Sequence, residues 1–187
     1  RVIELLENTL LTNMLELEVS KDENNNFVAS DDLLKVAVVE RHNALDKIGL
    51  GVVKGYGLKN GAIATSVSHD SHNIIVVGDD DDDMYLAVNR IQEINGGIVL
   101  VKDGKVIGEL PLPIGGLMSD LSLKEIDNHL RELNKLAYRE LKINRSLDPF
   151  ISLSFLALPV IPNIKITDQG LFDVMRNTFV DLEIKGI

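Results

Sequence analysis

Short apolar runs rich in β-branched residues recur along the first half of the chain and predict a series of strands. Residues 15–19 and 33–40 have the length and composition of strands, and the polar run Lys21 to Asn26 between them predicts an exposed turn. Glycines recur around Val52 and Val53, a pattern that indicates a further strand with close backbone approach or bulges. The chain therefore begins as a β-rich fold.

Two more buried strands are predicted at Ala62 to Val67 and Ile74 to Val77. The segment that joins them, called here the polar junction, consists of Ser68, His69, Asp70, Ser71, His72 and Asn73. Hydroxyl, imidazole and carboxylate groups are thus concentrated between two apolar runs. The polar junction is where the sequence predicts candidate chemistry.

One helix is predicted over 82–94, because its apolar residues recur at helical spacing. Five aspartates, Asp79 to Asp83, lead into it. Carboxylates at a helix start accept unpaired N–H groups and complement the helix dipole, so we interpret this run as a cap. A hard-cation site is the alternative, but consecutive carboxylates lack the alternating spacing and the glycine of a calcium-binding loop.

A second helix is predicted over 122–142, where Ser122 and Glu125 form a capping-box pattern. His129 flanks its apolar stripe and is interpreted as a boundary residue. Between the two helices, Ile98 to Val101 and Val106 to Leu110 predict a hairpin across Asp103 and Gly104.

The last section predicts a buried strand and a structured return loop over 148–174, followed by an edge strand at Phe179 to Ile184. The combined pattern predicts an α+β (mixed α/β) fold. Its sheet is expected to be mixed, largely antiparallel and built from six or more strands, with the helices at 82–94 and 122–142 packed against it.

Composition narrows the classes of function. The 187 residues are 45% hydrophobic, enough for one substantial core and a single main domain. A net charge of −10 without a basic stripe argues against nucleic acid as a partner. The absence of cysteine excludes disulfides and thiolate nucleophiles. The longest apolar stretch, Leu153 to Ile161, is far shorter than the roughly 20 residues that span a bilayer, so no membrane association is expected.

Several chemistries are open at the polar junction. His69 and His72 could bind a metal together if the backbone turns at Asp70 and Ser71, and two imidazoles with a carboxylate suit Zn²⁺, Mn²⁺ or Fe²⁺. A plain hydrogen-bonded network is the alternative. A local Ser-His-Asp triad is a weaker hypothesis, since triad members normally come from distant positions.

A second polar end, Arg41-His42-Asn43, follows the predicted strand at 33–40 and could lie beside the polar junction. Its Arg and Asn side chains offer fixed donors for a planar heteroaromatic ligand. The alternative is a strand terminus whose polar groups are satisfied locally.

Four ordered blocks carry a family resemblance. They are Lys35 to His42 (K-V-A-V-V-E-R-H), Gly61 to Gly78, Leu112 to Asp120 (L-P-I-G-G-L-M-S-D) and Leu153 to Pro162 (L-S-F-L-A-L-P-V-I-P). Together they resemble the C-terminal region of bacterial-type adenine deaminases, which belong to the amidohydrolases.

The resemblance implies a cytoplasmic enzyme of purine salvage and adenine catabolism that hydrolyses adenine to hypoxanthine and ammonia. In that family a barrel domain holds a divalent metal, Mn or Fe, which activates water. Such a barrel needs about 250 residues, so this shorter chain is expected to be a fragment, inactive alone, whose partner is the barrel of the same polypeptide. Residues 1–30 are then an arm or linker strands that follow the barrel, and 31–187 form the C-terminal domain. A homo-oligomer is also possible.

Under this interpretation, the polar junction faces the mouth of the barrel, closing over adenine or supporting the metal site. The candidate site-supporting residues are Arg41, His42, His69, Asp70, His72 and Asn73. The rival hypothesis is a non-catalytic interdomain or oligomerisation module that uses the Gly115-Gly116 loop and the segment 153–162. A third is an independent metal hydrolase that uses His42, His69 and His72.

Overall fold

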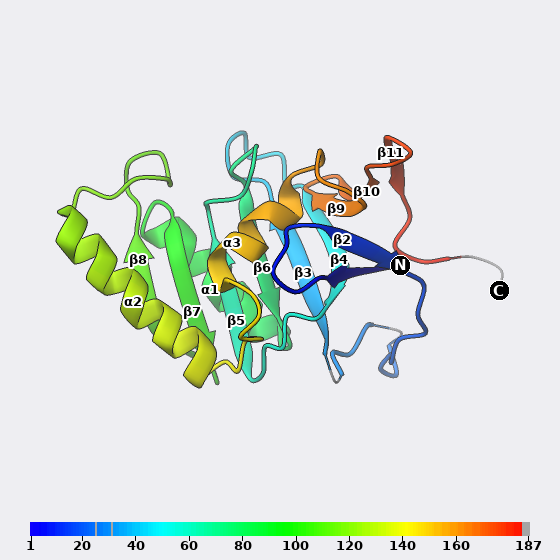
Figure 1. Cartoon of the computed structure of the whole chain (residues 1–187), viewed down its shortest axis with the longest axis horizontal. Helices are drawn as coiled ribbons and strands as arrows, with labels where there is room; N and C mark the ends of the chain where they lie inside the picture. The colour runs from blue at the N-terminus through cyan, green and yellow to red at the C-terminus, as the bar shows by residue number, and fades with distance from the viewer. Residues whose placement is uncertain (25, 31, 185–187) are drawn as a thin grey trace.

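The computed structural model describes residues 1–24, 26–30 and 32–184. Its centre is an eight-stranded sheet in the order β2-β1-β4-β3-β6-β5-β7-β8 (Figure 1). The strands are β1 (Val2–Leu5), β2 (Thr12–Leu15), β3 (Leu33–Val39), β4 (Ile48–Lys54), β5 (Gly61–Thr65), β6 (Ile74–Gly78), β7 (Gly97–Lys102) and β8 (Lys105–Pro111). Every neighbouring pair is antiparallel except β1 and β4, which run parallel. The predicted α+β fold with a mixed, largely antiparallel sheet is confirmed.

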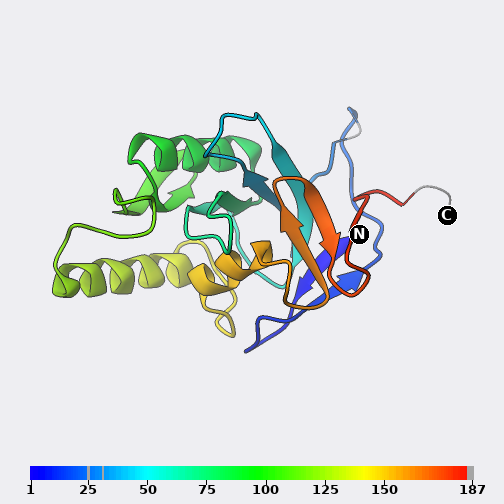
Figure 2. The ribbon, with the colours of Figure 1, turned by 90° about the horizontal axis from the view of Figure 1, so that it is seen from above.

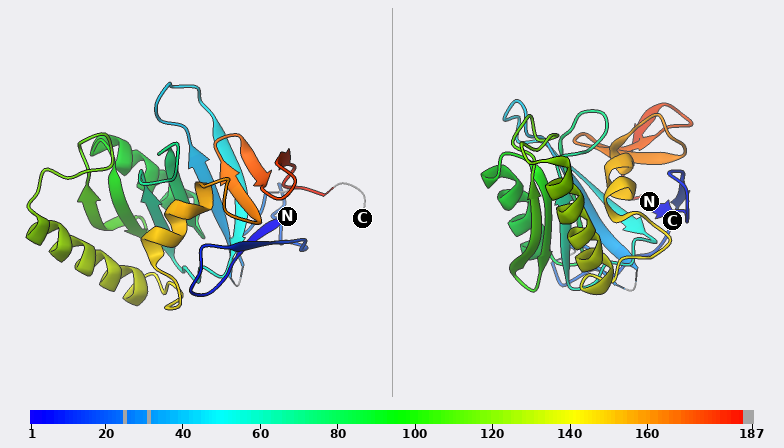
Figure 3. Two further views of the ribbon diagram at one scale, coloured as in Figure 1. Left: turned by 45° about the horizontal axis from the view of Figure 1, so that its top comes forward. Right: turned by 60° about the vertical axis from the view of Figure 1, so that its left-hand side comes forward.

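Helices and a second sheet cover the two faces of this sheet. The remaining elements are α1 (Asp81–Glu93), α2 (Leu123–Arg139), α3 (Pro149–Ser154), a 3-10 turn (Phe155–Ala157), β9 (Ile164–Thr167), β10 (Gly170–Asp173) and β11 (Thr178–Val180). Helix α1 packs on one face, whereas α2, α3 and the small β9–β11 sheet lie on the other (Figure 2). The small sheet adjoins α3 at the end of the molecule away from α2 (Figure 3).

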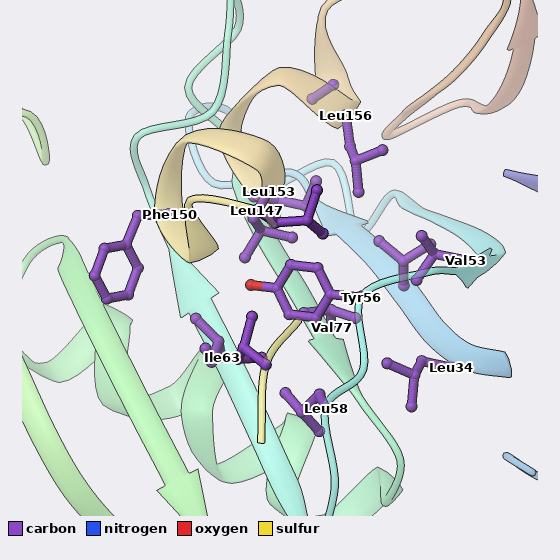
Figure 4. Packing of buried hydrophobic residues seen from close by; sticks show 14 of the residues in the cluster. Leu34, Val53, Tyr56, Leu58, Ile63, Val77, Leu147, Phe150, Leu153 and Leu156 are labelled. Atoms are coloured by element: carbon purple, nitrogen blue, oxygen red, sulfur yellow. The ribbon is translucent and has the colours of Figure 1, made fainter. Parts of the chain in front are cut away.

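The main core lies between the large sheet and the layer formed by α2, α3 and the small sheet. Tyr56 is fully buried in it, with its ring among aliphatic side chains (Figure 4). Its hydroxyl donates to the backbone oxygen of Pro149 at 2.7 Å, and burial raises the pKa of this phenol far above its usual value. A second core lies beneath α1, so β5 and β6 are buried on both faces.

The predicted helix starts are confirmed. The Asp80 carboxylate caps α1 by accepting from the Asp83 backbone N–H at 3.0 Å. Ser122 and Glu125 form the predicted capping box at the start of α2. Helix α2 ends at Arg139, three residues before the predicted end, and Lys142 then adopts φ +61° as the chain turns. The hairpin of β7 and β8 closes across Asp103 and Gly104, as predicted.

Two strand predictions were wrong. Residues 16–19 are not a strand, because β2 pairs only with the four residues of β1, which the sequence pattern missed. The apolar run from Pro149 forms α3 instead of a strand, since Asp148 caps it by accepting from the N–H groups of Phe150 and Ile151. Such a short buried run has no periodicity that separates helix from strand.

The predicted edge strand at 179–184 is shorter and earlier than expected. It is β11, three residues that end at Val180, and Asp181 to Ile184 are not strand. Positions 185–187 lie outside the described residues. The exposed turn over 21–26 is confirmed at its described positions, with residue 25 outside them. In the described ranges, no helix is long and apolar enough to cross a membrane.

Candidate functional site

The polar junction lies where three strands of the large sheet end together. Strands β3, β5 and β8 run in the same direction, since each is two antiparallel steps from the next, so the segments that follow them meet at one end of the sheet. Strand β5 stops at Thr65, whose Oγ1 accepts from the backbone N–H of Val67 at 3.0 Å. The chain therefore leaves the sheet two residues earlier than predicted.

The end of α3 holds the first part of the polar junction. The Ser154 hydroxyl donates to the backbone oxygen of Val67, and the Ser154 backbone oxygen accepts from the N–H of His69 at 3.1 Å. Ser154 is 5% exposed. Ser154, which lies in the segment predicted to be a strand, thus positions His69. The sequence did not indicate this role.

A turn in the polar junction brings its two histidines together. The His72 N–H donates to the Ser68 backbone oxygen at 2.7 Å, and the two imidazole centroids lie 5.4 Å apart in an edge-to-face arrangement. The His69 ring also packs against Phe155, with centroids 4.6 Å apart. Asp70 and Ser71 are exposed at the outside of this turn.

Arg41 ties this turn to two other segments. Its Nε donates to the His72 backbone oxygen at 2.6 Å, and its Nη2 donates to the Gly115 backbone oxygen at 2.8 Å. The Arg41 backbone N–H also faces Asn73 Oδ1 at 3.4 Å. Burial lowers the pKa of this guanidinium, which nonetheless stays charged.

His42 is exposed and lies against the same turn. Its Nε2 is 2.7 Å from the backbone oxygen of Ser71. Because a carbonyl only accepts, this contact requires a hydrogen on Nε2. The Glu40 carboxylate accepts from the N–H groups of Leu45, Asn43 and His42, which lowers its pKa. These bonds shape the segment between β3 and β4.

Ser66 is a further organising residue that sequence reasoning missed. Its fully buried hydroxyl donates to the Gly116 backbone oxygen at 2.6 Å and accepts from the Gly97 N–H at 2.8 Å. Gly96 approaches Gly116 so closely that a Cβ on Gly96 would lie 2.3 Å from the Gly116 Cα. The two glycine pairs, 96–97 and 115–116, are the sequence signal that could have indicated this contact.

The surroundings of His72 favour its neutral form. Burial lowers its pKa most, and the neighbouring His69 and Arg41 lower it further. Its Nδ1 and the Ser68 hydroxyl are buried polar atoms without a hydrogen-bond partner among the described residues. A neutral imidazole in this position can donate and accept but carries no charge at neutral pH.

Two open grooves flank the polar junction. One, of about 570 Å³, is lined by Asp70, Ser71 and the aromatic rings of Phe172 and Phe179, among others. The other, of about 550 Å³, lies on the α1 side and is lined by Arg41, Ile74 and Asn95, among others. The site is therefore partly an internal network and partly open surface.

The sequence model described as the adenine deaminase C-terminal domain matches residues 9–178. This chain belongs to that family. It is 47% identical to an adenine deaminase of Nitratidesulfovibrio vulgaris strain DP4 over 98% of this chain and 32% of the relative. It is 50% identical to one of Lysinibacillus sphaericus over 99% of this chain and 32% of the relative, and 47% identical to one of Bacillus subtilis over 97% and 31%. The chain thus spans about a third of the length of these relatives.

The adenine deaminase domain does not contain the geometry of a metal centre in its described part. No group of three or more His, Asp and Glu side chains there is placed to hold an ion, and the chain has no cysteine. His69 and His72 approach each other without a third ligand. The hypothesis of an independent metal hydrolase built on His42, His69 and His72 therefore finds no geometric support.

A local serine triad is likewise not assembled. The Ser68 hydroxyl has no partner among the described residues, and the Ser71 hydroxyl accepts from the Asn73 backbone N–H at 3.5 Å. Neither hydroxyl is hydrogen-bonded to a histidine, the contact that a nucleophile and its base require.

Proposed function

We propose that the intact protein hydrolyses adenine to hypoxanthine and ammonia, and that this C-terminal domain borders the site where adenine binds. The observation that supports the activity is the match of nearly the whole chain to proteins named adenine deaminase. The part that precedes this domain, an amidohydrolase barrel, carries the chemistry. Residues 1–30 then follow that barrel as linker strands, of which β1 and β2 join the edge of the large sheet.

The divalent metal of the proposed reaction, Mn or Fe, belongs to the preceding barrel. The described residues of this domain do not fit it, since they provide no cluster of three ligands. The contribution of this domain is instead to position and enclose the substrate. Purine salvage and adenine catabolism in the cytoplasm are the corresponding cellular role.

Within this domain, we assign the substrate-facing role to the exposed part of the polar junction and to His42. Asp70, Ser71 and His42 are exposed, and the half-buried His72 follows Ser71 directly in the chain, with a pKa lowered by burial. Neutral imidazole and hydroxyl groups match the neutral, hydrogen-bonding edges of a purine. Arg41 and Asn73 hold this surface through backbone contacts, and His69 supports it by packing against His72.

The test uses the intact enzyme with His69→Ala and His72→Ala, and His129→Ala as the matched control on the exposed face of α2. Turnover of adenine should fall by about tenfold to a hundredfold in the first two variants, the range expected when a positioning group is lost. The free energy of unfolding should change by less than about 1 kcal/mol. His129→Ala should change neither.

This role would be contradicted if the His69 and His72 variants lost stability to the same extent as turnover, so that unfolding accounted for the lost activity. That outcome would favour the rival function, a non-catalytic interdomain or oligomerisation module, in which the histidines only hold the fold. The rival is supported by the side chains of Arg41 and Ser66, which already donate to backbone oxygens. Groups that are satisfied in this way hold the fold and do not require a ligand. Absence of hypoxanthine with the unmodified intact enzyme would overturn the proposed activity itself.

A further inference from the structure

We propose that the turn after β8 is a docking element that inserts into an apolar hollow of the preceding catalytic part of the same enzyme. Three large apolar side chains of this turn face solvent: Ile114 is 48% exposed, Leu117 38% and Met118 59%. We call these three residues the apolar tip. The inference rests on the proposed function, because it names a surface through which this domain contacts the catalytic part.

The backbone of the tip is closed on itself. The Ile114 N–H donates to the Met118 oxygen at 3.1 Å, and the Met118 N–H donates back to the Ile114 oxygen at 3.2 Å. Between them, Gly115 and Gly116 have φ of +68° and +77°. Consecutive left-handed residues favour glycine, so this turn is built with a defined shape.

The same backbone is held on its inner side by two residues that flank the polar junction. Arg41 donates to the Gly115 oxygen at 2.8 Å and the buried Ser66 hydroxyl donates to the Gly116 oxygen at 2.6 Å. A Cβ on Gly116 would lie 2.6 Å from Arg41 Nη2, so the guanidinium and the turn are in direct contact. The polar side of the turn is therefore satisfied inward, which leaves its apolar side chains directed outward.

An ordered apolar projection of this kind can act as an anchor at an interface. Its side chains enter a pocket on the partner and contribute most where solvent is fully excluded. The thioether of Met118 adapts to irregular pockets. Residues 110–118 contain no charged side chain, although the whole chain carries a net charge of −10. An uncharged, apolar hollow is thus the surface that fits the tip.

Two observations select the catalytic part of the enzyme as the occupant. This domain matches about a third of the length of its relatives, as their C-terminal domain, so a larger preceding region is the first candidate partner for its exposed surfaces. Arg41 donates to the backbone oxygens of both Gly115 and His72, so the turn that carries the tip lies next to the polar junction. A partner that covers the polar junction also meets the tip.

Methionine oxidation in the intact enzyme tests this contact without reference to activity. Met118 and Met175 are similarly exposed in this domain, 59% and 68%, and would be oxidised by hydrogen peroxide at similar rates if neither were covered. Docking predicts that Met118 is oxidised about tenfold or more slowly than Met175, because a packed interface core excludes solvent. Equal rates in peptide mass spectrometry would overturn the proposal. Since no turnover is measured, this result is independent of whether adenine is the substrate.

A photocrosslink identifies the occupant. The intact enzyme would carry Met118→p-benzoylphenylalanine, and a second preparation with Met175→p-benzoylphenylalanine is the control. A crosslink from position 118 to a peptide of the preceding catalytic part supports the proposal. A crosslink to this domain of a second copy, or no crosslink at a position that is oxidised freely, overturns it.

Discussion

Arg41 Nη2 donates to the backbone oxygen of Gly115 at 2.8 Å, so the end of β3 is joined to the turn after β8 across 74 positions of sequence. The same guanidinium donates from Nε to His72. One side chain therefore joins three segments that are distant in sequence. A planar fork of donors suits this task because it fixes two acceptors at once.

Replacing Arg41 by lysine keeps the positive charge but should break the hydrogen bonds that join these segments. A lysine ammonium cannot reproduce the two directed bonds, so Arg41→Lys is expected to lower the free energy of unfolding by about 1 kcal/mol or more. Urea denaturation of the chain measures this. Arg131→Lys is the control, because its pair with Asp127 is exposed and is expected to contribute less than about 0.5 kcal/mol. Equal effects of the two variants would argue against a linking role for Arg41.

Removing the small Ser66 hydroxyl should lower the free energy of unfolding by a large amount. Ser66→Ala leaves the Gly116 oxygen and the Gly97 N–H without their buried partner, with an expected loss of about 2 to 4 kcal/mol in the free energy of unfolding. Ser20→Ala removes an exposed hydroxyl and should change stability by less than about 0.5 kcal/mol. A loss below 1 kcal/mol for Ser66→Ala would show that water readily replaces the hydroxyl.

The buried phenol of Tyr56 can be tested by comparing two Tyr→Phe variants, one buried and one exposed. Tyr56→Phe removes the bond to the Pro149 oxygen at the start of α3 and should destabilise the fold by about 1 to 3 kcal/mol. Tyr85→Phe should be nearly neutral, since Tyr85 is 71% exposed on α1. Thermal or urea unfolding compares the two, and similar values would contradict the importance of the buried bond.

Because of Lys165, the free energy of unfolding is expected to rise at alkaline pH. It is 1% exposed, its Nζ donates to the Leu10 backbone oxygen at 2.9 Å, and burial lowers its pKa to about 8. The unfolded lysine titrates near 10.5, so the unfolded state binds more protons between these two values. This residue should therefore add stability as pH rises from about 8 to about 10.5, by up to about 3 kcal/mol.

The control for this pH effect is Lys165→Met. Measured by urea denaturation, the difference in unfolding free energy between the original chain and this variant should shift in favour of the original chain across that pH window. A difference that stays constant from pH 7 to 10.5 would mean that Lys165 keeps its ordinary pKa in the folded chain.

The local signals in the sequence predicted those elements whose geometry depends on nearby residues. The capping box of Ser122 and Glu125 and the turn at Asp103 and Gly104 are short-range arrangements, and both were predicted correctly. The helical run from Pro149 was not, because apolar residues in a short buried segment suit helix and strand equally well. The parallel pairing of β1 with β4 also depends on contacts distant in sequence.

By itself, the sequence determined the α+β class, the two long helices, the position of the polar junction and the family to which the chain belongs. Only the tertiary structure decided what surrounds that junction. Ser66, Arg41 and Ser154 act on backbone groups of segments far away along the chain. Such contacts leave no periodic pattern, since they arise where strands of one direction end together and bring distant loops within hydrogen-bond distance.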